Sequence, residues 1–266
     1  MVLAKPWERP YADAMPQRRV FVSDSFPVLQ EALVTAVRVV KEAEPLVPMT
    51  VVTTSAPLAV RLRRAIARAG KGHFALRVCT LADFAREVAE DSLVDEGRRR
   101  LPSLAAPLLM KGLLDEVEPE NYFAPLASLP GFSPVLLATL HDLAQANVSP
   151  QLLRDFLQRA PQGELSRHKV ESLTALYARY ERVIEEQRVY DDHVIVERAI
   201  TLLEAETSPT PLFWYGFYDF TPLQRRLVAA AVQGRDTLLF FPWRGGEAYA
   251  HATSTLTWLT NLGFQV

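Results

Sequence analysis

The feature that most constrains the fold of this chain is a set of short, continuous apolar runs near its two ends. They read RRVFVS (18–23), MTVVTT (49–54), FALRVC (74–79), LFWYGF (212–217) and TLLFFP (237–242), with GFQV (263–266) as a weaker sixth. Most are unbroken runs of β-branched, aromatic and leucine residues, which is typical of strands covered on both faces. Helical patterns separate the runs, so the sequence predicts a parallel sheet with helices on both faces.

The long middle of the chain shows only helical patterns. From about residue 100 to 206 no segment has a convincing strand pattern, and apolar residues between 173 and 184 recur at helical spacing. We therefore expect an irregular lead-in at 1–17, an α/β domain made of 18–99 and 207–266, and an all-helical subdomain of 100–206 inserted into it.

Composition excludes several classes of protein. The chain of 266 residues has a net charge of −2 and one cysteine, Cys79. A wholly basic nucleic-acid-binding arm, a disulfide framework and a cysteine-bound metal or iron–sulfur site are therefore excluded. The first residues lack an apolar signal core, and no run reaches the roughly 18 apolar residues that a bilayer span needs. We expect a cytoplasmic protein without a membrane partner.

Several predicted helices share one kind of start. A hydroxyl residue stands one or two positions before a proline at Ser55, Ser133, Ser149 and Thr221. Such a side chain can accept hydrogen bonds from the free N–H groups of the first turn, where proline loses nothing. Asp191 or Asp192 is likewise expected to cap the helix that runs through Ala199. A metal cluster with His193 is disfavoured, because adjacent residues on a helix do not face one another.

The turn after the first strand decides against a nucleotide site of the usual kind. It reads VFVSDSFPVLQEAL and holds neither glycine nor lysine. A Walker-type loop needs glycines so that backbone amides can surround a phosphate, and a lysine to meet the β- and γ-phosphates. The GxGxxG pattern of dinucleotide sites is missing too. The sequence thus predicts no ATP hydrolysis, no catalytic residue, no metal and no bound cofactor.

Several stretches, taken in order, resemble the first motor domain of UvrD-like superfamily 1 helicases. The resemblance is closest to the degenerate version in AddB-like subunits of bacterial helicase–nuclease complexes. The stretches are VVTTSAPLAVRLRRAIA, RVCTLADFAREV, YFAPLASLPGFSPVLLATLHDLAQANVSP and VYDDHVIVERAI. The first is similar to a helicase segment that touches single-stranded DNA, and the third to the helical insertion of AddB-like subunits. The resemblance implies an α/β fold with a parallel sheet of P-loop NTPase (RecA-like) type, helices on both faces and an all-helical inserted subdomain.

The stretch FWYGFYDFTPLQRR resembles the segment that carries two acids in active helicases. There a strand ends in Asp-Glu, which hold Mg²⁺ and orient the attacking water, and a glutamine follows. On that pattern Gly216 and Phe217 stand at the two acid positions, the degenerate Walker B site. Gln224 falls near the trailing glutamine, and Asp219 lies beyond the strand end. The resemblance implies a motor domain that is kept as a scaffold.

The function implied is that of a catalytically inactive helicase-like domain in a DNA double-strand-break repair subunit. Its partners would be single-stranded DNA or DNA ends and an AddA-like helicase subunit. The candidate DNA-binding residues are Thr54, Ser55 and Thr80 at strand ends, with Arg61 and Arg64 on nearby phosphates. AddB-like subunits also carry a second motor-like domain and a PD-(D/E)XK nuclease with an iron–sulfur cluster. This sequence has neither the four cysteines of such a cluster nor the nuclease signature, so we expect it to represent the N-terminal part of an AddB-like subunit.

Two other functions stay open. One is a small-molecule transferase, for a nucleotide sugar or a methyl group, with its pocket around Ser23, Thr54, Thr80 and Gly216 at the strand carboxyl ends. The other is a protein-interaction module without DNA contact.

Basic residues cluster in three places. They are Arg61, Arg63, Arg64, Arg68 and Lys71, then Arg98, Arg99 and Arg100, and then Arg225 and Arg226. Each cluster by itself is typical of a solvated helix face balanced by nearby acids. Together they permit a path of phosphate contacts.

Overall fold

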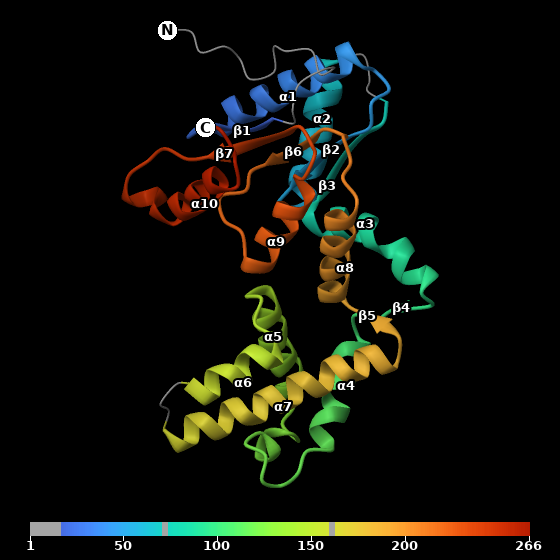
Figure 1. Cartoon of the computed structure of the whole chain (residues 1–266), viewed down its shortest axis with the longest axis vertical. Coiled ribbons are helices and arrows are strands. Elements are labelled where there is room, and N and C mark those ends of the chain that lie inside the picture. The colour runs from blue at the N-terminus through green and yellow to red at the C-terminus, as the bar shows by residue number, and fades with distance from the viewer. Residues whose placement is uncertain (1–16, 71–73, 160–162) are drawn as a thin grey trace. The chain divides into compact units, whose positions relative to one another are not determined.

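The computed structural model describes residues 17–70, 74–159 and 163–266 (Figure 1). In this part of the chain it forms a mixed α/β structure with a five-stranded parallel sheet and ten α-helices. The chain divides into a sheet unit, with residues up to 88, 199–220 and 225–266, and a helical unit, with 89–198 and 221–224. Three of the four boundaries fall within helices, and the fourth lies between residues 220 and 221. The lead-in expected at 1–17 lies, apart from Gln17, outside the described residues.

The sheet confirms the five main strand predictions. Its strands are β1 (Arg18–Ser23), β2 (Met49–Thr53), β3 (Leu76–Thr80), β6 (Leu212–Tyr215) and β7 (Thr237–Pro242). They run parallel in the order β1-β7-β6-β2-β3. The weaker sixth run contributes a single parallel bridge between Gln265 and Arg19. Because the strands are parallel, their carboxyl ends share one edge of the sheet.

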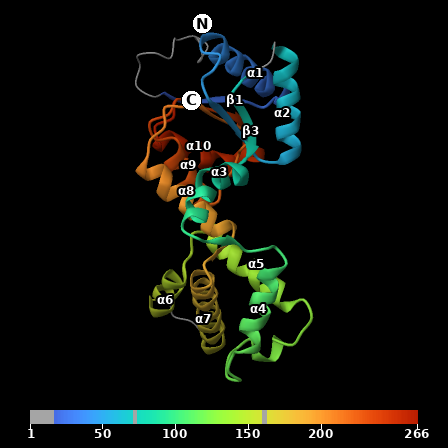
Figure 2. The ribbon, with the colours of Figure 1, turned by 90° about the vertical axis from the view of Figure 1, so that its right-hand side faces the viewer.

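Helices cover both faces of this sheet, which explains the continuous apolar runs. On one side lie α1 (Phe26–Ala43) and α2 (Ala56–Ala69); on the other lie α9 (Pro222–Ala231) and α10 (Ala250–Asn261) (Figures 1 and 2). The core under α1 and α2 includes Val51, Phe213, Tyr215, Leu238 and Phe240. The alternate strand residues Val52, Trp214, Leu239 and Phe241 are also fully buried. Since side chains alternate along a strand, they fill the opposite face.

The helical unit has a core of its own. Its helices are α4 (Ala105–Asp115), α5 (Phe132–Gln145), α6 (Pro150–Arg159) and α7 (Glu164–Glu186), with a short 3-10 turn at Ala124–Leu126. Helices α3 (Leu81–Asp95) and α8 (Asp192–Ala205) each hold a unit boundary. Buried leucines of α4 and α5 pack with Leu176, Tyr177, Tyr180 and Ile184 of α7. This confirms the apolar stripe predicted on the long helix.

The expectation that 100–206 holds no strand was wrong in one detail. Strand β4 (Arg99–Arg100) pairs in parallel with β5 (Val189–Tyr190). Each strand is only two residues long, so neither leaves a period in the sequence that could reveal it. Within the described residues we find no helix with both the length and the hydrophobicity that a bilayer span requires.

The predicted hydroxyl caps form at two of the four helix starts. The Oγ of Ser149 accepts a hydrogen bond from the N–H of Leu152 at 3.2 Å. The hydroxyl of Thr221 accepts one from the N–H of Gln224 at 3.3 Å, and the Gln224 Oε1 accepts one from the N–H of Thr221 at 3.1 Å. This reciprocal pair is a capping box.

Of the other two cap predictions, that for Ser55 was right in position only, and that for Ser133 was wrong. Ser55 occupies the N-cap position of α2, but its side chain makes no capping hydrogen bond. Ser133 lies inside α5, whose N-cap is Gly131 at φ +82°. A positive φ costs glycine little, so the helix begins before the serine is reached.

These caps lead to a stability prediction with an internal control. We expect Thr221→Ala to lower the free energy of unfolding by about 1 kcal/mol, because it removes one half of a capping box. Ser55→Ala should change it by less than about 0.5 kcal/mol, since no capping bond is lost. Urea unfolding midpoints of both variants check this. A loss below about 0.5 kcal/mol for Thr221→Ala as well would show that the Thr221 hydroxyl adds little.

Candidate functional site

The carboxyl edge of the sheet brings several of the predicted residues together. Thr53 pairs with Thr80 on one side and with Tyr215 on the other. Thr54 and Gly216 therefore follow two neighbouring strands directly, as expected for an edge site in an α/β fold. The chemistry possible at this edge depends on the side chains at these positions and on their hydrogen-bond partners.

Gly216, which the sequence resemblance sets at the first acid position, has a backbone suited to glycine. Its φ is +82°, and its N–H donates to the carbonyl of Phe240 at 3.2 Å. A Cβ at this position would lie 3.4 Å from the Cδ2 of Leu58. Any side chain here would be strained by the positive φ, so the turn leaves this position without a functional group.

Phe217, which the sequence resemblance sets at the second acid position, belongs to the core. Its side chain is 4% exposed. The ring stacks on Phe220, with centroids 5.0 Å apart and planes 13° apart, and meets the Trp214 ring edge-on at 5.8 Å. Aromatic pairs of this geometry add to the stability of the core. Phe217 is thus a packed hydrophobic core residue.

Tyr215 is a residue that the sequence analysis did not single out. It is 2% exposed, and its hydroxyl donates to the carbonyl of Phe26 at 3.2 Å. Burial raises the pKa of this hydroxyl, so it remains a neutral donor. The bond joins the end of β6 to the first residue of α1. It therefore joins the turn after β1, where a Walker-type phosphate loop would lie, to the end of β6, where the resemblance sets the two acids.

The turn between β1 and α1 satisfies its own polar groups. The Ser23 Oγ accepts the N–H of Ser25 at 3.1 Å, and the Ser23 carbonyl accepts the N–H of Trp243 at 3.0 Å. Arg244 lies 3.6 Å from the carboxylate of Asp24. The serine hydroxyl and the aspartate are thus both engaged within the protein.

The polar residues after β6 also have local roles. The Oδ1 of Asp219 accepts a hydrogen bond from the N–H of Phe220 at 2.8 Å. Gln224, which falls near the helicase glutamine in the sequence comparison, forms the capping box with Thr221. Gln224 thus serves the start of α9, and Asp219 serves the turn before it.

Thr80 shapes the start of α3. Its hydroxyl donates to the Oδ2 of Asp83 at 2.7 Å and accepts the N–H of Asp83 at 3.1 Å. The Thr80 N–H donates to the same carboxylate at 3.3 Å. These bonds, led by that of the hydroxyl, lower the pKa of Asp83. Thr54 and Ser55, by contrast, are exposed, and neither hydroxyl forms a hydrogen bond within the described residues.

The Thr80–Asp83 box predicts a change in acid stability. A carboxyl whose pKa is lowered by folding stabilises the fold above the unfolded value of about 3.9, and this contribution is lost as the pH falls through the folded pKa. Thr80→Ala should raise the Asp83 pKa and cost about 1 kcal/mol at pH 7, with a smaller cost at pH 3. NMR titration of Asp83 and urea unfolding at both pH values check this. An unchanged Asp83 pKa would contradict it.

Helix α2 carries a one-sided positive charge. Its 14 residues include four arginines and no acid. Arg61, Arg64 and Arg68 recur at helical spacing on one face, and all three are exposed. The Arg61 Nε donates to the Oε1 of Gln30 at 3.0 Å. Lys71, the fifth member of the predicted cluster, lies outside the described residues.

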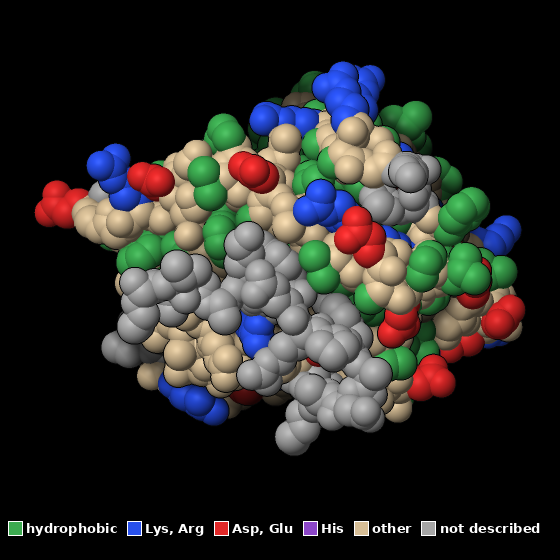
Figure 3. Space-filling view, turned by 90° about the horizontal axis from the view of Figure 1, so that it is seen from above, with side chains coloured by type: hydrophobic (Ala, Val, Ile, Leu, Met, Phe, Trp, Pro, Cys, Tyr) green, Lys and Arg blue, Asp and Glu red, His purple; other side chains and the backbone are tan. Residues whose placement is uncertain are grey.

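The surface around α1 and α2 mixes positive and apolar side chains. Figure 3 views the molecule from the end where these helices lie in Figure 1, and shows Lys and Arg side chains among hydrophobic and some acidic ones. Within the described residues, the α2 arginines form no ion pair. Their charge is therefore available to a negatively charged partner.

The other two basic clusters are engaged within the protein. Arg98 donates to Glu185 at 2.7 Å and lies 3.5 Å from Glu96, and these acids raise its pKa. Arg100 pairs with Asp192 at 3.0 Å. The guanidinium of Arg225 lies 5.3 Å from the centre of the Trp258 ring. At least one arginine of each of these two clusters thus has an ion pair or a ring contact within the protein. The α2 arginines, by contrast, form no ion pair within the described residues.

A comparison with protein-family models supports the resemblance drawn from the sequence. The model described as "ADDB, N-terminal" matches residues 64–236, which is more than half of the chain. The chain belongs to the AddB N-terminal family. A search of curated proteins gave no match.

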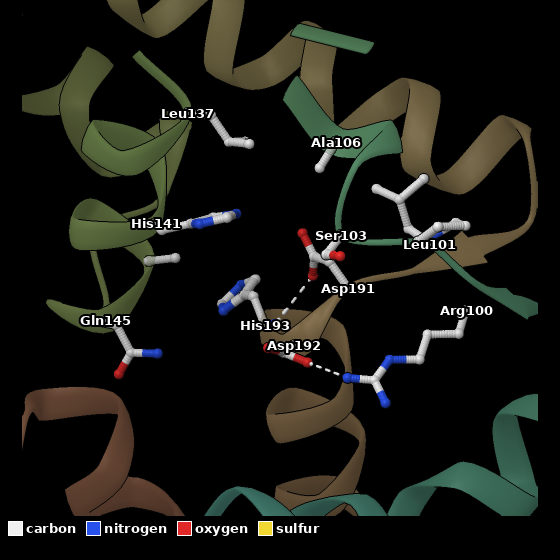
Figure 4. A pocket seen from close by; sticks show the side chains of 12 residues that line it. Arg100, Leu101, Ser103, Ala106, Leu137, His141, Gln145, Asp191, Asp192 and His193 are labelled. Atoms are coloured by element: carbon white, nitrogen blue, oxygen red, sulfur yellow. Dashed lines mark hydrogen bonds and ion pairs between the residues drawn. The ribbon is translucent and has the colours of Figure 1, made fainter. Parts of the chain in front are cut away.

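The region that matches the AddB family contains a cavity in the helical unit. This cavity was not predicted from the sequence. It has a volume of about 670 Å³ and lies between the segment after β4, helix α5 and the start of α8 (Figure 4). Leucine, proline and alanine side chains form much of its wall, and His141, Gln145 and His193 add polar groups. No single motif could reveal it, because three separate segments line it.

Asp191 organises one wall of this cavity. Its Oδ1 accepts the N–H groups of His193 at 3.0 Å and Val194 at 3.1 Å, which confirms its predicted role as the N-cap of α8. Its Oδ2 accepts the hydroxyl of Tyr180 at 3.1 Å, and burial together with this carboxylate raises the tyrosine pKa. Within the described residues, no group of three or more His, Cys, Asp or Glu could hold a metal ion.

Proposed function

We propose that this chain is a RecA-like motor domain without nucleotide chemistry, which an AddB-like repair subunit uses to bind single-stranded DNA and to dock on a partner helicase. One observation carries the proposal: the place of the two catalytic acids is taken by Gly216, at φ +82°, and by Phe217, which is buried. The family match over residues 64–236 supports the part of the proposal that assigns the domain to an AddB-like subunit.

The loss of ATP hydrolysis follows from the requirements of phosphoryl transfer. The reaction needs a carboxylate for Mg²⁺, a residue that positions water, and a cation on the phosphates. Phe217 and Gly216 supply neither carboxylate, and the turn from Ser23 to Phe26 has no lysine. The bond between the Tyr215 hydroxyl and Phe26 further supports a closed region between β6 and this turn.

Binding of single-stranded DNA is supported by charge and exposure. Helix α2 presents Arg61, Arg64 and Arg68 to solvent, and phosphate contacts supply most of the affinity of sequence-independent binding. Thr54 and Ser55 lie exposed where this helix begins and can donate hydrogen bonds to phosphate oxygens. Thr80 can join them only by releasing Asp83, so we assign it to the cap of α3.

The domain plan and the docking role belong to the same proposal. A five-stranded parallel sheet and a helical unit made of 89–198 are consistent with a RecA-like domain, 18–99 and 207–266, that holds the insertion 100–206. A domain that keeps its fold without chemistry can still contribute surface to a complex. An AddA-like helicase subunit is the partner that this family relationship favours.

Two measurements test the proposal together. ATP turnover should not exceed background, with or without DNA, and single-stranded oligonucleotides should bind with an affinity that falls steeply as salt rises. Calorimetry against S-adenosylmethionine and a nucleotide sugar tests the transferase alternative. ATP hydrolysis above background would refute the silent motor. Absence of both salt-dependent DNA binding and association with an AddA-like subunit would refute the scaffold.

A further inference from the structure

Phe26 is an exposed aromatic residue at the carboxyl edge of the sheet. It is the first residue of α1, and 52% of it is exposed. Pro27 and Val28 beside it are exposed as well. Deeper in the same helix the apolar residues, such as Leu29 and Leu33, are fully buried. The fold thus leaves an aromatic ring exposed to solvent at the start of α1, outside the core.

The backbone that carries this ring is fixed. The carbonyl of Phe26 accepts the hydroxyl of buried Tyr215 at 3.2 Å. The N–H of Ser25 donates to the Ser23 Oγ at 3.1 Å, and the N–H of Leu29 donates to the Ser25 carbonyl at 3.0 Å. A ring on an anchored backbone loses little conformational freedom when a ligand stacks on it.

The exposed ring is next to the basic face of α2. Gln30 follows Phe26 by one helical turn, so their side chains are neighbours on α1. The Gln30 Oε1 accepts a hydrogen bond from the Nε of Arg61 at 3.0 Å. Arg64 and Arg68 continue from Arg61 along α2 on the same face, over a rise of about 10 Å. One row of side chains thus runs from the aromatic ring through Gln30 to the three arginines.

The chemistry of this row selects one class of ligand. Three regularly spaced cations suit a chain of phosphates, and a flat apolar ring suits the face of a base. Asp24, the acid in the turn, lies 3.6 Å from Arg244, which offsets its charge. Duplex DNA keeps its bases stacked internally, and a lipid surface or a polyphosphate has no bases to stack. Single-stranded nucleic acid offers both an exposed base for the aromatic ring and phosphates for the arginines.

We infer that Phe26 is a stacking platform for an unpaired base at the head of a track whose phosphate contacts are Arg61, Arg64 and Arg68. The inference rests on the proposed function, since it needs single-stranded DNA as the ligand. The inference adds that the affinity depends on the bases of the strand as well as on its phosphate charge. A stacked base is sequence-tolerant, so no preference among the bases is required.

The test compares two ligands with the complete 266-residue chain. Fluorescence anisotropy measures binding of oligo-dT and of an abasic strand of equal length, each about 12 nucleotides. Phe26→Ala and Phe26→Leu should each weaken oligo-dT binding about tenfold and leave the abasic strand unchanged. Phe26→Trp should retain the affinity. The matched control is Phe74→Ala, because Phe74 is 75% exposed but lies ahead of β3, at the other end of the strands.

The outcomes separate this inference from the function on which it rests. If wild-type protein binds neither strand, the proposed DNA role fails. If removing the three arginines abolishes binding but Phe26→Leu changes nothing, the DNA role stands and the stacking platform is refuted. Equal loss for oligo-dT and the abasic strand would also refute stacking. Loss of association with an AddA-like subunit, with DNA binding intact, would show that Phe26 belongs to a protein-docking face and not to a DNA track.

Discussion

Replacing Phe217 by aspartate is expected to lower the free energy of unfolding by at least about 4 kcal/mol. The substitution removes a ring that is 4% exposed and stacks on Phe220 at 5.0 Å. Truncation of a buried phenylalanine alone costs about 3–5 kcal/mol, and a buried carboxylate without a partner adds to that cost. Urea unfolding at neutral pH measures the change. An acid placed at this position, the one proposed to correspond to Walker B, should therefore unfold the domain rather than confer ATP hydrolysis.

Two companion variants separate lost packing from buried charge. Phe217→Leu keeps an apolar side chain of similar reach and should cost less than about 2 kcal/mol. Phe217→Ala should fall between leucine and aspartate, because it leaves a cavity but no charge. Aspartate that is tolerated as well as leucine would show that water reaches this position. The closed-site explanation for a silent motor would then be wrong.

Replacing Arg61, Arg64 and Arg68 together by alanine is expected to weaken single-stranded DNA binding at least about tenfold at low salt. Within the described residues these side chains form no ion pair, so their charge is not spent inside the protein. Three lost phosphate contacts should also make the slope of log K against log salt less negative by about 2. Fluorescence anisotropy at several salt concentrations measures both quantities.

A control triple with the same change in net charge tests whether position matters. Arg38, Arg154 and Arg167 are exposed and interact with Glu42, Gln151 and Glu171 within one helical turn. Their replacement by alanine should reduce affinity by less than about threefold, because only long-range attraction is lost. If both triples weaken binding equally, net charge and not the α2 face explains the DNA affinity.

The sheet could be predicted because its strands are covered on both faces. A run such as TLLFFP is apolar at every position, and this local property remains visible without tertiary context. The cap of α8 by Asp191 was predictable for the same reason, since a cap depends on residues two and three positions away. Two-residue strands such as Arg99–Arg100 leave no comparable pattern.

The candidate site could be predicted only in part. The sequence resemblance sets Gly216 and Phe217 at the acid positions of active helicases, and the structure shows how these two residues are packed. The sequence does not reveal that Thr80 is engaged by Asp83, because a threonine at a strand end suits both a cap and a phosphate contact. Ser55 and Ser133 show the same ambiguity, since a hydroxyl before a proline caps a helix only when the backbone presents it to free N–H groups.

By itself the sequence determined the parallel sheet, the helical middle and a turn after the first strand without glycine or lysine, because each depends on residue types at adjacent or regularly spaced positions. Only the tertiary structure joined Tyr215 to Phe26, 189 positions away, and Gln30 to Arg61, 31 positions away. It also assembled the cavity of the helical unit from three segments. Such contacts depend on strand order and on how α1 and α2 pack over the sheet, and no local pattern records where distant side chains meet.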